Sequence, residues 1–480
     1  MFEPLSRAFR SLKMKPKSMS KDDIAEFLRV TPQALAAFEQ AYTKAALSME
    51  DDNFFSVNSR DASAQNHLLD STTLQENNTF DAHELEALVS KIVKELLCET
   101  QLYVFDGTDV KTFTPAPNIP SASVSNEDLH SIPLSIRPQL TGRLMKVDMQ
   151  GPNYQHLLWL YRESLNAKSE GRRKQAYHMF RQGLDILDLD EVMYRIIETN
   201  PNSMGHWFPQ LVEACKSQSF FKLPATTIAR VPLSLLQLTR VDYELLTPST
   251  LRIVDEWAYR AFGLNEEKEY FIKTGTYSSK FDYRNAYVHG AKEVHELGEY
   301  LLFIHYQALR MAGPLSSPCI YGVSTTNEWV VREYIPDKEG NPCIYKGLPL
   351  HTEYRVFVDC DSDTVIGISP YWEPETMKKR FAHEADANSP HQIHDYIIFS
   401  SHEEVLMQRY MKNKDAVADG IRAILPTLNL CGQWSVDVMQ NGEDFYIIDM
   451  AVAENSAFYE WVPKELRHPR AENWLPDISS

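Results

Sequence analysis

Two apolar segments near the C-terminal end of the chain each carry one acidic residue. Asp437 lies in WSVDVM and Asp449 in DFYIIDM, on either side of an Asn441-Gly442 pair that is typical of a hairpin turn. A carboxylate in an apolar strand is costly to bury unless a cation compensates it. Mg²⁺ binds through one or two carboxylates together with nucleotide phosphates. The two acids therefore predict a magnesium site on adjacent strands.

Two lysines further upstream could bind phosphate. Lys273 lies in the strand-like segment EYFIKTG, and Lys280 follows a turn-prone run of Gly, Ser and Thr. A phosphate chain needs fixed cations and small residues whose backbone N–H groups can approach it. The spacing is not that of a Walker motif. Phosphate binding is one interpretation of this segment, and a solvated lysine at a strand end is the other.

The segment WVVREYIP predicts an apolar strand that ends in a polar hinge. It delivers Arg332, Glu333, Tyr334 and Ile335 in succession. The backbone groups of such a strand edge can hydrogen-bond to a purine while tyrosine and isoleucine cover its face. A plain edge strand is the alternative.

The segment HTEYRVFVDC predicts a central strand with a charged pair on one face. Alternation places Glu353, Arg355 and Phe357 on the same side of the strand. Charged residues in such a strand must be paired or must face a cleft. A structural salt bridge and a binding cleft therefore both stay open as interpretations.

These features lie in a region that alternates short strands with longer helices and begins near residue 205. Aromatic and β-branched residues are dense there, which is typical of strands. We expect strands at TTIARVPLSLL (226–236), EYFIKTG, EWVVREYIP, YRVFVDC, TVIGISPYW, QWSVDVM and DFYIIDM, and helices at Pro248 to Ala261, Ala291 to Met311, His402 to Lys412 and Asp415 to Leu425. The predicted fold class of residues 205–480 is mixed α/β (α+β).

A mostly helical accessory region is expected before this domain. Residues 1–150 combine helices with two linkers, near 51–80 and 114–138, that are rich in small polar residues or proline. Between the linkers, residues 82–99 predict an amphipathic helix, followed by the strand QLYVF. Residues 151–204 predict a helical hairpin. It is similar to one tetratricopeptide unit, but a single unit does not make a stable array.

The composition limits the partners. The chain has 66 acidic and 48 basic residues, a net charge of −18, so it is a poor nonspecific ligand for nucleic acid or anionic membranes. The helix pair at 21–48 could read DNA, but it lacks clustered Arg and Lys, which favours a plain helical hairpin. No apolar run approaches the roughly 20 residues that cross a bilayer.

The N-terminal residues and the cysteines favour a cytoplasmic location. The first residues lack an apolar signal core, and their basic residues leave a transit peptide as an alternative, against which Glu3 argues. The six cysteines show no CxxC spacing. They predict buried thiols in a reducing compartment rather than a disulfide scaffold or a zinc site.

The order of these motifs resembles the ATP-grasp superfamily. Within it, the chain looks most similar to the cell-division-cycle ATP-grasp proteins, which assemble eukaryotic translation initiation factor two, and to their microbial relatives. The resemblance covers roughly residues 205–462 and rests on Trp207-Phe208-Pro209, Lys273 followed by Ser278, Ser279 and Lys280, VVREYI, EYRVFV, IGIS, and the strands of Asp437 and Asp449.

The resemblance implies an ATP cleft between two α+β subdomains, with ATP and Mg²⁺ as cofactors. Lys273 and Lys280 would hold the phosphates, and Arg355 would neutralise their charge. The metal ligands would be Asp437 and Asp449. Adenine and ribose would meet Glu333 and the backbone around Tyr334 and Ile335, next to Arg332 in the same nucleotide-binding set.

The sequence departs from the family at one metal position. Members often have Asn two residues after the second acid, and this chain has Ala451 there. Glu454 or Asn455, from the turn that follows, would replace it, and Asn455 is the third candidate metal ligand. The second metal site, and turnover with it, depends on that replacement.

Two functions follow from the resemblance. The first is an ATP-dependent carboxylate–amine ligase, in which a carboxylate attacks the γ-phosphate and an amine then displaces phosphate from the acylphosphate. Lys273 and Arg355 would be its catalytic residues, through positioning and charge neutralisation. Arg380 and His383 could reach an anionic acceptor or simply be solvated. The second function is an assembly factor, in which ATP and Mg²⁺ organise a protein partner without turnover.

Overall fold

The computed structural model of the chain describes residues 82–117, 200–241, 243–312, 326–383 and 390–468, with a few isolated positions between these ranges. The predictions for the helix pair at 21–48 and the linker near 51–80 lie outside the described residues. So do most of the linker at 114–138 and of the hairpin at 151–204.

The first of two large sheets has six strands in the order β2-β1-β4-β7-β5-β6, and every neighbouring pair in it is antiparallel. The strands are β1 (Gln101–Phe105), β2 (Val110–Phe113), β4 (Thr226–Arg230), β5 (Tyr270–Thr274), β6 (Tyr287–Val288) and β7 (Glu328–Glu333). The predicted strand QLYVF is β1, and it pairs with β4 along its whole length. The sheet therefore includes strands from both sides of residue 150, where the sequence suggested a boundary.

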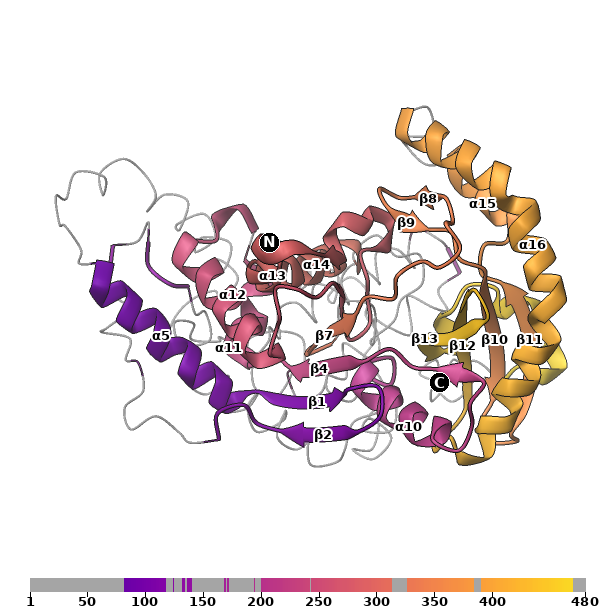
Figure 1. The fold of residues 1–480 in the computed structure, drawn as a ribbon, viewed down its shortest axis with the longest axis horizontal. Coiled ribbons are helices and arrows are strands. Elements are labelled where there is room, and N and C mark those ends of the chain that lie inside the picture. Colours follow the sequence, from indigo (N-terminus) through magenta and orange to yellow (C-terminus); the bar gives the residue numbers. More distant parts are fainter. Residues whose placement is uncertain are drawn as a thin grey trace.

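Helices cover one face of this sheet (Figure 1). They are α5 (Ala82–Glu99), α12 (Pro248–Phe262), α13 (Gly290–His295) and α14 (Leu297–Ala312). The ends of α12 follow from its sequence. Thr247 caps the N-terminus by accepting a hydrogen bond from Thr250 N, Pro248 occupies the first turn, and Gly263 closes the C-terminus with φ +58°. Trp257 of α12 packs edge-to-face on Trp329 of β7, with ring centroids 5.5 Å apart.

The second sheet has five strands in the order β11-β10-β12-β13-β3. They are β3 (Phe221–Lys222), β10 (Glu353–Asp359), β11 (Thr364–Pro370), β12 (Gln433–Asn441) and β13 (Asp444–Val452). Only the β13–β3 pair is parallel. The hairpin between β12 and β13 turns at Gly442-Glu443, with φ +66° at Gly442. A positive φ at the first central residue alone is typical of a type II′ turn.

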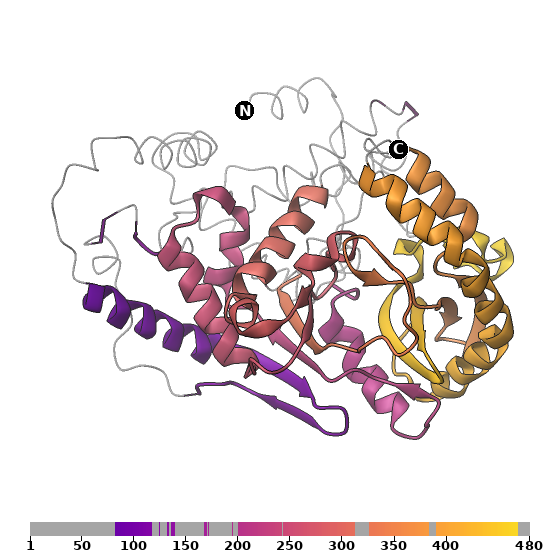
Figure 2. The ribbon, with the colours of Figure 1, turned by 45° about the horizontal axis from the view of Figure 1, so that its top comes forward.

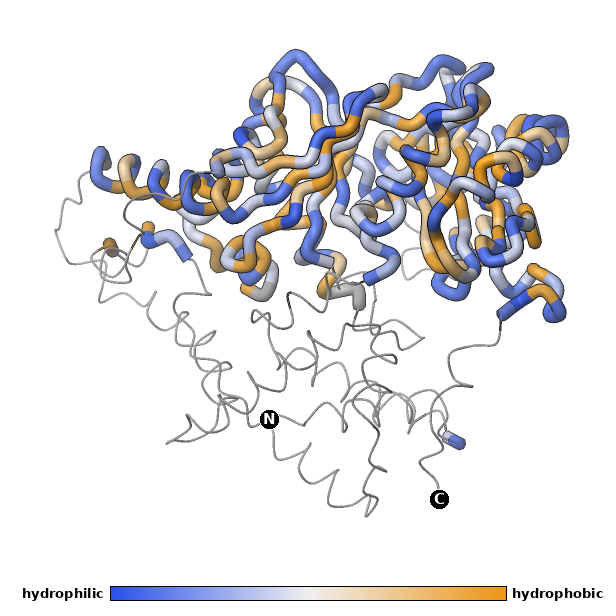
Figure 3. The backbone as a smooth tube through the Cα atoms, turned by 90° about the horizontal axis from the view of Figure 1, so that it is seen from below, coloured by the Kyte–Doolittle hydropathy of each residue, from blue (hydrophilic) through white to orange (hydrophobic). Residues whose placement is uncertain are grey.

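Helices α10 (Met204–Cys215) and α16 (Pro390–Ile424) join the two halves of the fold. Their apolar faces share one buried cluster with Tyr354, Val356 and Val358 of β10 and with residues of β1, β4 and β7. In Figure 1, α10 lies at the bottom of the view between the strands of the two sheets, and α16 runs along the outer side of the second sheet. Figure 2 shows α5 and the β1–β2 hairpin at the end of the molecule opposite α16. Apolar residues concentrate in the strands at the centre of the described part (Figure 3).

Several smaller elements lie between the main helices and strands in the sequence. They are α11 (Leu233–Leu236), β8 (Cys343–Ile344), β9 (Leu348–Pro349) and α15 (Pro374–His383), with 3₁₀ turns that include η5 (Lys280–Asn285) and η7 (Ala453–Asn455). The β8–β9 hairpin, α15 and the first half of α16 share a cluster around Trp372, Phe381 and Phe399. None of the helices among the described residues is long and apolar enough to span a membrane.

Three predicted elements differ from the structure. The strand expected over 226–236 ends at Arg230, because Pro232 has no N–H for the ladder and instead precedes α11. The helix expected over 291–311 is divided at Glu296 into α13 and α14. The two helices expected over 402–425 form part of one continuous helix, α16. The mixed α/β class and the strand-rich C-terminal half agree with the prediction.

Candidate functional site

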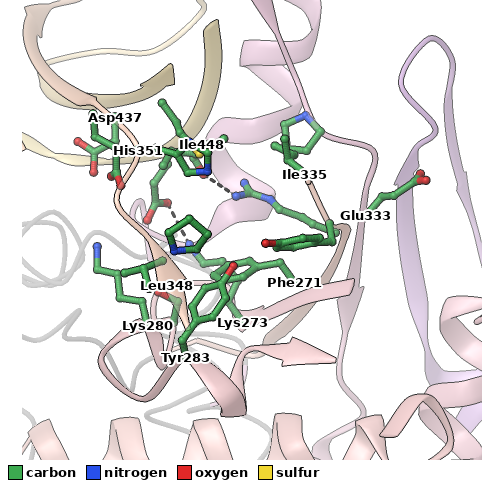
Figure 4. Close-up of a pocket in the computed structure, with 18 residues that line it drawn as sticks. Phe271, Lys273, Lys280, Tyr283, Glu333, Ile335, Leu348, His351, Asp437 and Ile448 are labelled. Carbon is green, nitrogen blue, oxygen red and sulfur yellow. Dashed lines mark hydrogen bonds and ion pairs between the residues drawn. The ribbon is translucent and has the colours of Figure 1, made fainter. Parts of the chain in front are cut away.

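A pocket lies between the two sheets (Figure 4). Its walls come from β5, β7 and the loop after β7 on one side, and from β10, β12 and β13 on the other. Eight of the predicted phosphate-, nucleotide- and metal-binding residues line it: Lys273, Lys280, Arg332, Glu333, Tyr334, Ile335, Asp437 and Asp449. Residues more than 170 positions apart in the chain therefore meet in one place.

Lys273 joins the two sheets inside the pocket. Its side chain is 3% exposed, and Nζ donates a hydrogen bond to Asp449 Oδ1 at 3.0 Å. Burial lowers the pKa of the Lys273 ammonium, and the neighbouring Arg332 cation adds to this, against the opposite effect of Asp449. An ammonium has three donors, so two are left for an anion in the pocket.

Arg332 makes a second link between the sheets. A β-bulge in β13 separates the pairs Asp437–Asp449 and Val438–Ile447, and Arg332 Nη1 donates to the carbonyl oxygen of the extra residue, Ile448, at 2.5 Å. The Nε atom of Arg332 is buried and has no hydrogen-bond partner among the described residues. Burial lowers the pKa of the guanidinium to about 10, so Arg332 is still charged at neutral pH.

The two acids face each other directly across β12 and β13. Like charges in such a pair repel, and here each acid has its own cation. Arg355 holds Asp437 through two hydrogen bonds, from Nε at 2.8 Å and Nη2 at 2.7 Å. Burial acts to raise the pKa of Asp449, but Lys273 and Arg332 outweigh it and lower the pKa overall. Asp449 is therefore suited to remain a carboxylate at neutral pH.

Arg355 does not line the pocket but lies behind Asp437. Burial acts to lower the pKa of its guanidinium, and the Asp437 carboxylate outweighs this and raises the pKa. Its Cζ atom lies 4.7 Å from the ring centroid of Tyr371. In the structure, Arg355 compensates an acid, and its link to phosphate stays a prediction.

Lys280 and Glu353 occupy the end of the pocket next to Tyr371. Lys280 Nζ hydrogen-bonds to the Tyr371 hydroxyl and lies 4.3 Å from the centroid of its ring. Burial acts to lower the pKa of Lys280, whereas Tyr371 and Glu353 raise it, and the net shift is upward. Glu353 is 8% exposed, and burial raises the pKa of its carboxyl to about 7. The Glu–x–Arg strand thus turns Glu353 toward the pocket, whereas Arg355 forms a structural pair.

The sequence did not single out Tyr371 as a site residue. It follows β11, and no spacing or charge marks it in the segment TVIGISPYW. Of the candidate acceptor residues, Arg380 places Cζ 4.4 Å from the centroid of the Phe281 ring, and the side chain of His383 is outside the described part.

Two backbone N–H groups of the hinge after β7 form hydrogen bonds within the protein. The N–H of Glu333 donates to Ala225 O and that of Tyr334 donates to Glu269 O. The N–H of Ile335 makes no hydrogen bond within the described part of the protein, so it is the amide available to a ligand. The Glu333 carboxylate is half exposed, pairs with Lys268 at 3.4 Å and points away from Lys273 in Figure 4.

Asn455 is not brought into the pocket. It lies exposed in η7, and its neighbours Glu454 and Ser456 line a separate surface hollow with Lys464, Arg467 and His468. Two other clusters have ligand atoms close enough to hold a metal, namely Asp337, Glu339 and His351, and Asp359, Asp361 and His468. Protein groups already engage the first cluster, since Arg409 pairs with Glu339 at 3.2 Å and Asn341 donates to Asp337 at 3.0 Å.

The fold and site define a mixed α/β protein with a charged pocket between two sheets. A comparison with protein-family models found no match, and a comparison with curated proteins found no similar sequence. Among solved structures, the C-terminally truncated Cdc123 from Schizosaccharomyces pombe matches with a TM-score of 0.34 and 11% identity, over 56% of this chain and 91% of that chain. A TM-score this low does not establish a common fold, so the function has to follow from the site itself.

Proposed function

We propose that the pocket between the sheets binds ATP together with Mg²⁺. The observation that carries this proposal is the separation of charge across the pocket. Lys273 and Arg332 come from the first sheet, and Asp437 and Asp449 from the second. A nucleotide triphosphate with its metal presents the complementary arrangement, with anionic oxygens for the cations and a cation for the carboxylates.

The donors of the pocket suit a phosphate chain. Lys273 has spare N–H donors, Arg332 has a buried Nε without a partner among the described residues, and Lys280 stands at the same wall. Buried donors without partners are costly, and phosphate oxygens would satisfy them. Lys273 and Lys280 would therefore hold the phosphates, with Arg332 supporting them.

The apolar part of the pocket lining suits a flat base. Phe271, Leu348, Met439 and Ile448 line the pocket, and the N–H of Ile335, which makes no hydrogen bond within the described residues, supplies a hydrogen-bond donor. Such a mixture of apolar walls and a few directed polar groups is typical of small-molecule sites. Asp437 and Asp449 would hold Mg²⁺, which when bound neutralises the phosphate oxygens and fixes their position.

The test is a calorimetric titration of ATP, with and without Mg²⁺, into the wild-type protein and Asp449→Asn. We expect Mg²⁺-dependent binding in the wild type and its loss in the variant. Asp444→Asn is the matched control, because Asp444 lies on the same strand but pairs with Lys222 and Lys338 outside the pocket. Absence of nucleotide binding by the wild-type protein would refute the proposal.

Turnover as a carboxylate–amine ligase is a second candidate function. Lys280, which hydrogen-bonds to Tyr371 and lines the pocket, would be the cation for a second anion beside the phosphates. In that reaction the acceptor carboxylate attacks the γ-phosphate, ADP leaves, and an amine displaces phosphate from the activated acyl group. ADP released in the titration samples only when carboxylates and amines are added would support a ligase.

An assembly factor is the alternative for a site that binds ATP without consuming it. Ala451 favours it, because a methyl group stands where the ligase family often has a metal-binding amide. ATP-dependent retention of a protein partner, lost in the double variant Lys273→Ala/Asp449→Ala, would support this role. Partner binding that is unchanged in the double variant would exclude it.

A further inference from the structure

Tyr371 lies next to the pocket and contacts cations that come from both of its sides. Its hydroxyl accepts a hydrogen bond from Lys280 Nζ, and its ring centroid lies 4.3 Å from the same atom. Arg355 Cζ lies 4.7 Å from the centroid of the same ring. Lys280 comes from the connection between β5 and β6 of the first sheet, and Arg355 comes from β10 of the second. One aromatic ring is therefore shared by two cations from different sheets.

The ring of Tyr371 is held in place from the side of the second sheet. Its backbone N–H donates to Glu353 O at 3.0 Å, which fixes it beside the first residue of β10. The ring packs edge-to-face on Trp372, with centroids 5.0 Å apart, and Trp372 is buried in the cluster that includes Phe381. A packed aromatic side chain in this position can hold the long, flexible side chain of Lys280 in one place.

This contact holds the Lys280 ammonium without an opposite charge. The partner of Lys273 is the Asp449 carboxylate, at 3.0 Å, whereas the direct partner of Lys280 is a hydroxyl group. Among the described residues, no carboxylate forms an ion pair with Lys280, although Glu353 and Asp437 act on its charge from further away. An ammonium has three donors, so two of them are available to an anion. Lys280 thus offers a ligand a positioned cation with spare donors.

The place of Lys280 in the pocket suits the far end of a nucleotide. In Figure 4, Lys280 lies on the side of the pocket away from Ile335, with Lys273 between them. A base that meets the N–H of Ile335 would direct its phosphate chain past Lys273 toward Lys280. The phosphate nearest to Lys280 would then be the terminal one, which a triphosphate has and a diphosphate lacks.

We propose that Tyr371 is a positioning residue, which holds the Lys280 ammonium against the terminal phosphate of ATP and so favours a triphosphate over a diphosphate. The inference rests on the proposed binding of ATP with Mg²⁺. Tyr371 is not among the described residues that line the pocket, so it acts through Lys280. A charged hydrogen bond to a phosphate that only ATP carries strengthens ATP binding and leaves ADP binding unchanged.

The test compares the affinities of ATP and ADP by calorimetric titration in the presence of Mg²⁺. We expect the wild-type protein to bind ATP more tightly than ADP. Tyr371→Phe removes the hydroxyl and keeps the ring, and it should weaken ATP binding by about two- to tenfold. Tyr371→Leu removes both and should weaken ATP binding by about tenfold or more. The affinity of both variants for ADP should match that of the wild type.

Tyr410→Phe is the matched control for the loss of a hydroxyl group. The Tyr410 hydroxyl donates to Ile368 O at 3.2 Å, outside the pocket, so its loss should change neither affinity. Lys280→Met gives the second comparison, because Tyr371 acts only through this lysine. It should weaken the binding of ATP and not that of ADP. Adding Tyr371→Leu to Lys280→Met should have no further effect on either nucleotide.

The outcomes separate this inference from the proposed function. If the wild-type protein binds neither nucleotide, ATP binding itself is refuted. If it binds ATP, the role of Tyr371 is refuted by any of three results: equal wild-type affinities for ATP and ADP, a Tyr371→Leu variant that changes both affinities equally or not at all, or additive effects of the two substitutions. Should Tyr371→Leu not fold, equal losses of ATP and ADP binding in Lys280→Met overturn the proposal without a change at Tyr371.

Discussion

The two sheets bring opposite charges to the pocket. The six-stranded sheet contributes Lys273 and Arg332, and the five-stranded sheet contributes Glu353, Asp437 and Asp449. The contacts across the pocket join these sets, from Lys273 to Asp449 and from Arg332 to the Ile448 carbonyl. Neither sheet can therefore form the site alone, and the charges that would bind a ligand also hold the halves together.

Two residues depart from this division. Glu333 is an acid on the six-stranded sheet and pairs with Lys268, and Arg355 is a cation on the five-stranded sheet. Its pair with Asp437 is buried, with side-chain exposures of 12% and 9%. We expect Arg355→Met to leave Asp437 buried and unpaired, and to lower the free energy of unfolding by about 3–5 kcal/mol. Urea unfolding followed by circular dichroism measures this.

The matched control is the exposed ion pair of Arg252 with Glu86. Arg252→Met should lower the free energy of unfolding by no more than about 1 kcal/mol, because both members of this pair are solvated. If Arg355→Met costs no more than this control, Asp437 is hydrated from the pocket and the pair has no structural role.

A substitution of Lys273 tests the contribution of the six-stranded sheet to ligand binding. Its partner Asp449 is 43% exposed toward the pocket, so water can replace the lysine. We therefore expect Lys273→Met to act mainly on binding. Loss of a charged hydrogen bond to phosphate costs about 1.5–3 kcal/mol, or roughly 10–150-fold in ATP affinity by calorimetry. Lys268→Met, at the rim, should change affinity far less. Equal effects of the two variants would contradict phosphate binding by Lys273.

Asp255 is a buried acid that forms no ion pair with any of the described residues. It lies on α12, accepts a hydrogen bond from Glu299 N at 2.7 Å, and burial raises the pKa of its carboxyl to about 7. An acid whose pKa is higher in the folded state destabilises the fold as pH rises from its unfolded value, about 4, through its folded value. The cost is complete above pH 7 and absent below pH 4.

We therefore expect Asp255→Asn to raise Tm at pH 8 by about 2–4 °C, the effect of roughly 1 kcal/mol in a domain of this size. The gain should shrink on acidification and vanish near pH 4. Differential scanning calorimetry at several pH values measures it, with the exposed Asp415→Asn as control. A gain that is constant across pH would show that charge is not its cause.

The strand-borne charges of the site could be predicted because each interrupts an apolar alternation. Lys273, Asp437 and Asp449 stand out in this way, and the structure brings all three to one pocket. Their pairing could not be predicted, since it depends on the register of β10, β12 and β13 and on the bulge at Ile448. The same register is what turns Glu353 toward the pocket.

The structure does not bring Asn455 to the pocket, and its role as a metal ligand stays a prediction. It follows Asp449 by six residues, but η7 turns the chain away after Val452. Tyr371 is far in the sequence from Lys280, to which it hydrogen-bonds, and it carries no charge. Nothing in the sequence therefore marked it as a site residue. The end of β4 could have been predicted from Pro232, which cannot donate a hydrogen bond to the sheet. The apolar residues after Pro232 led the prediction to extend the strand instead.

The short strand β3 determines the order in which this protein can be assembled. β3 covers the outer edge of β13 in parallel register, with Phe221 beside Phe445 and Lys222 beside Tyr446. These partners are separated by more than two hundred residues, so β13, which is synthesised last, gains its edge partner only when it returns to the start of the domain. A fragment that begins after residue 222 would expose the amides of β13, and a second copy could pair with them. Dividing the chain between its two sheets would therefore produce an aggregating half rather than a smaller soluble domain.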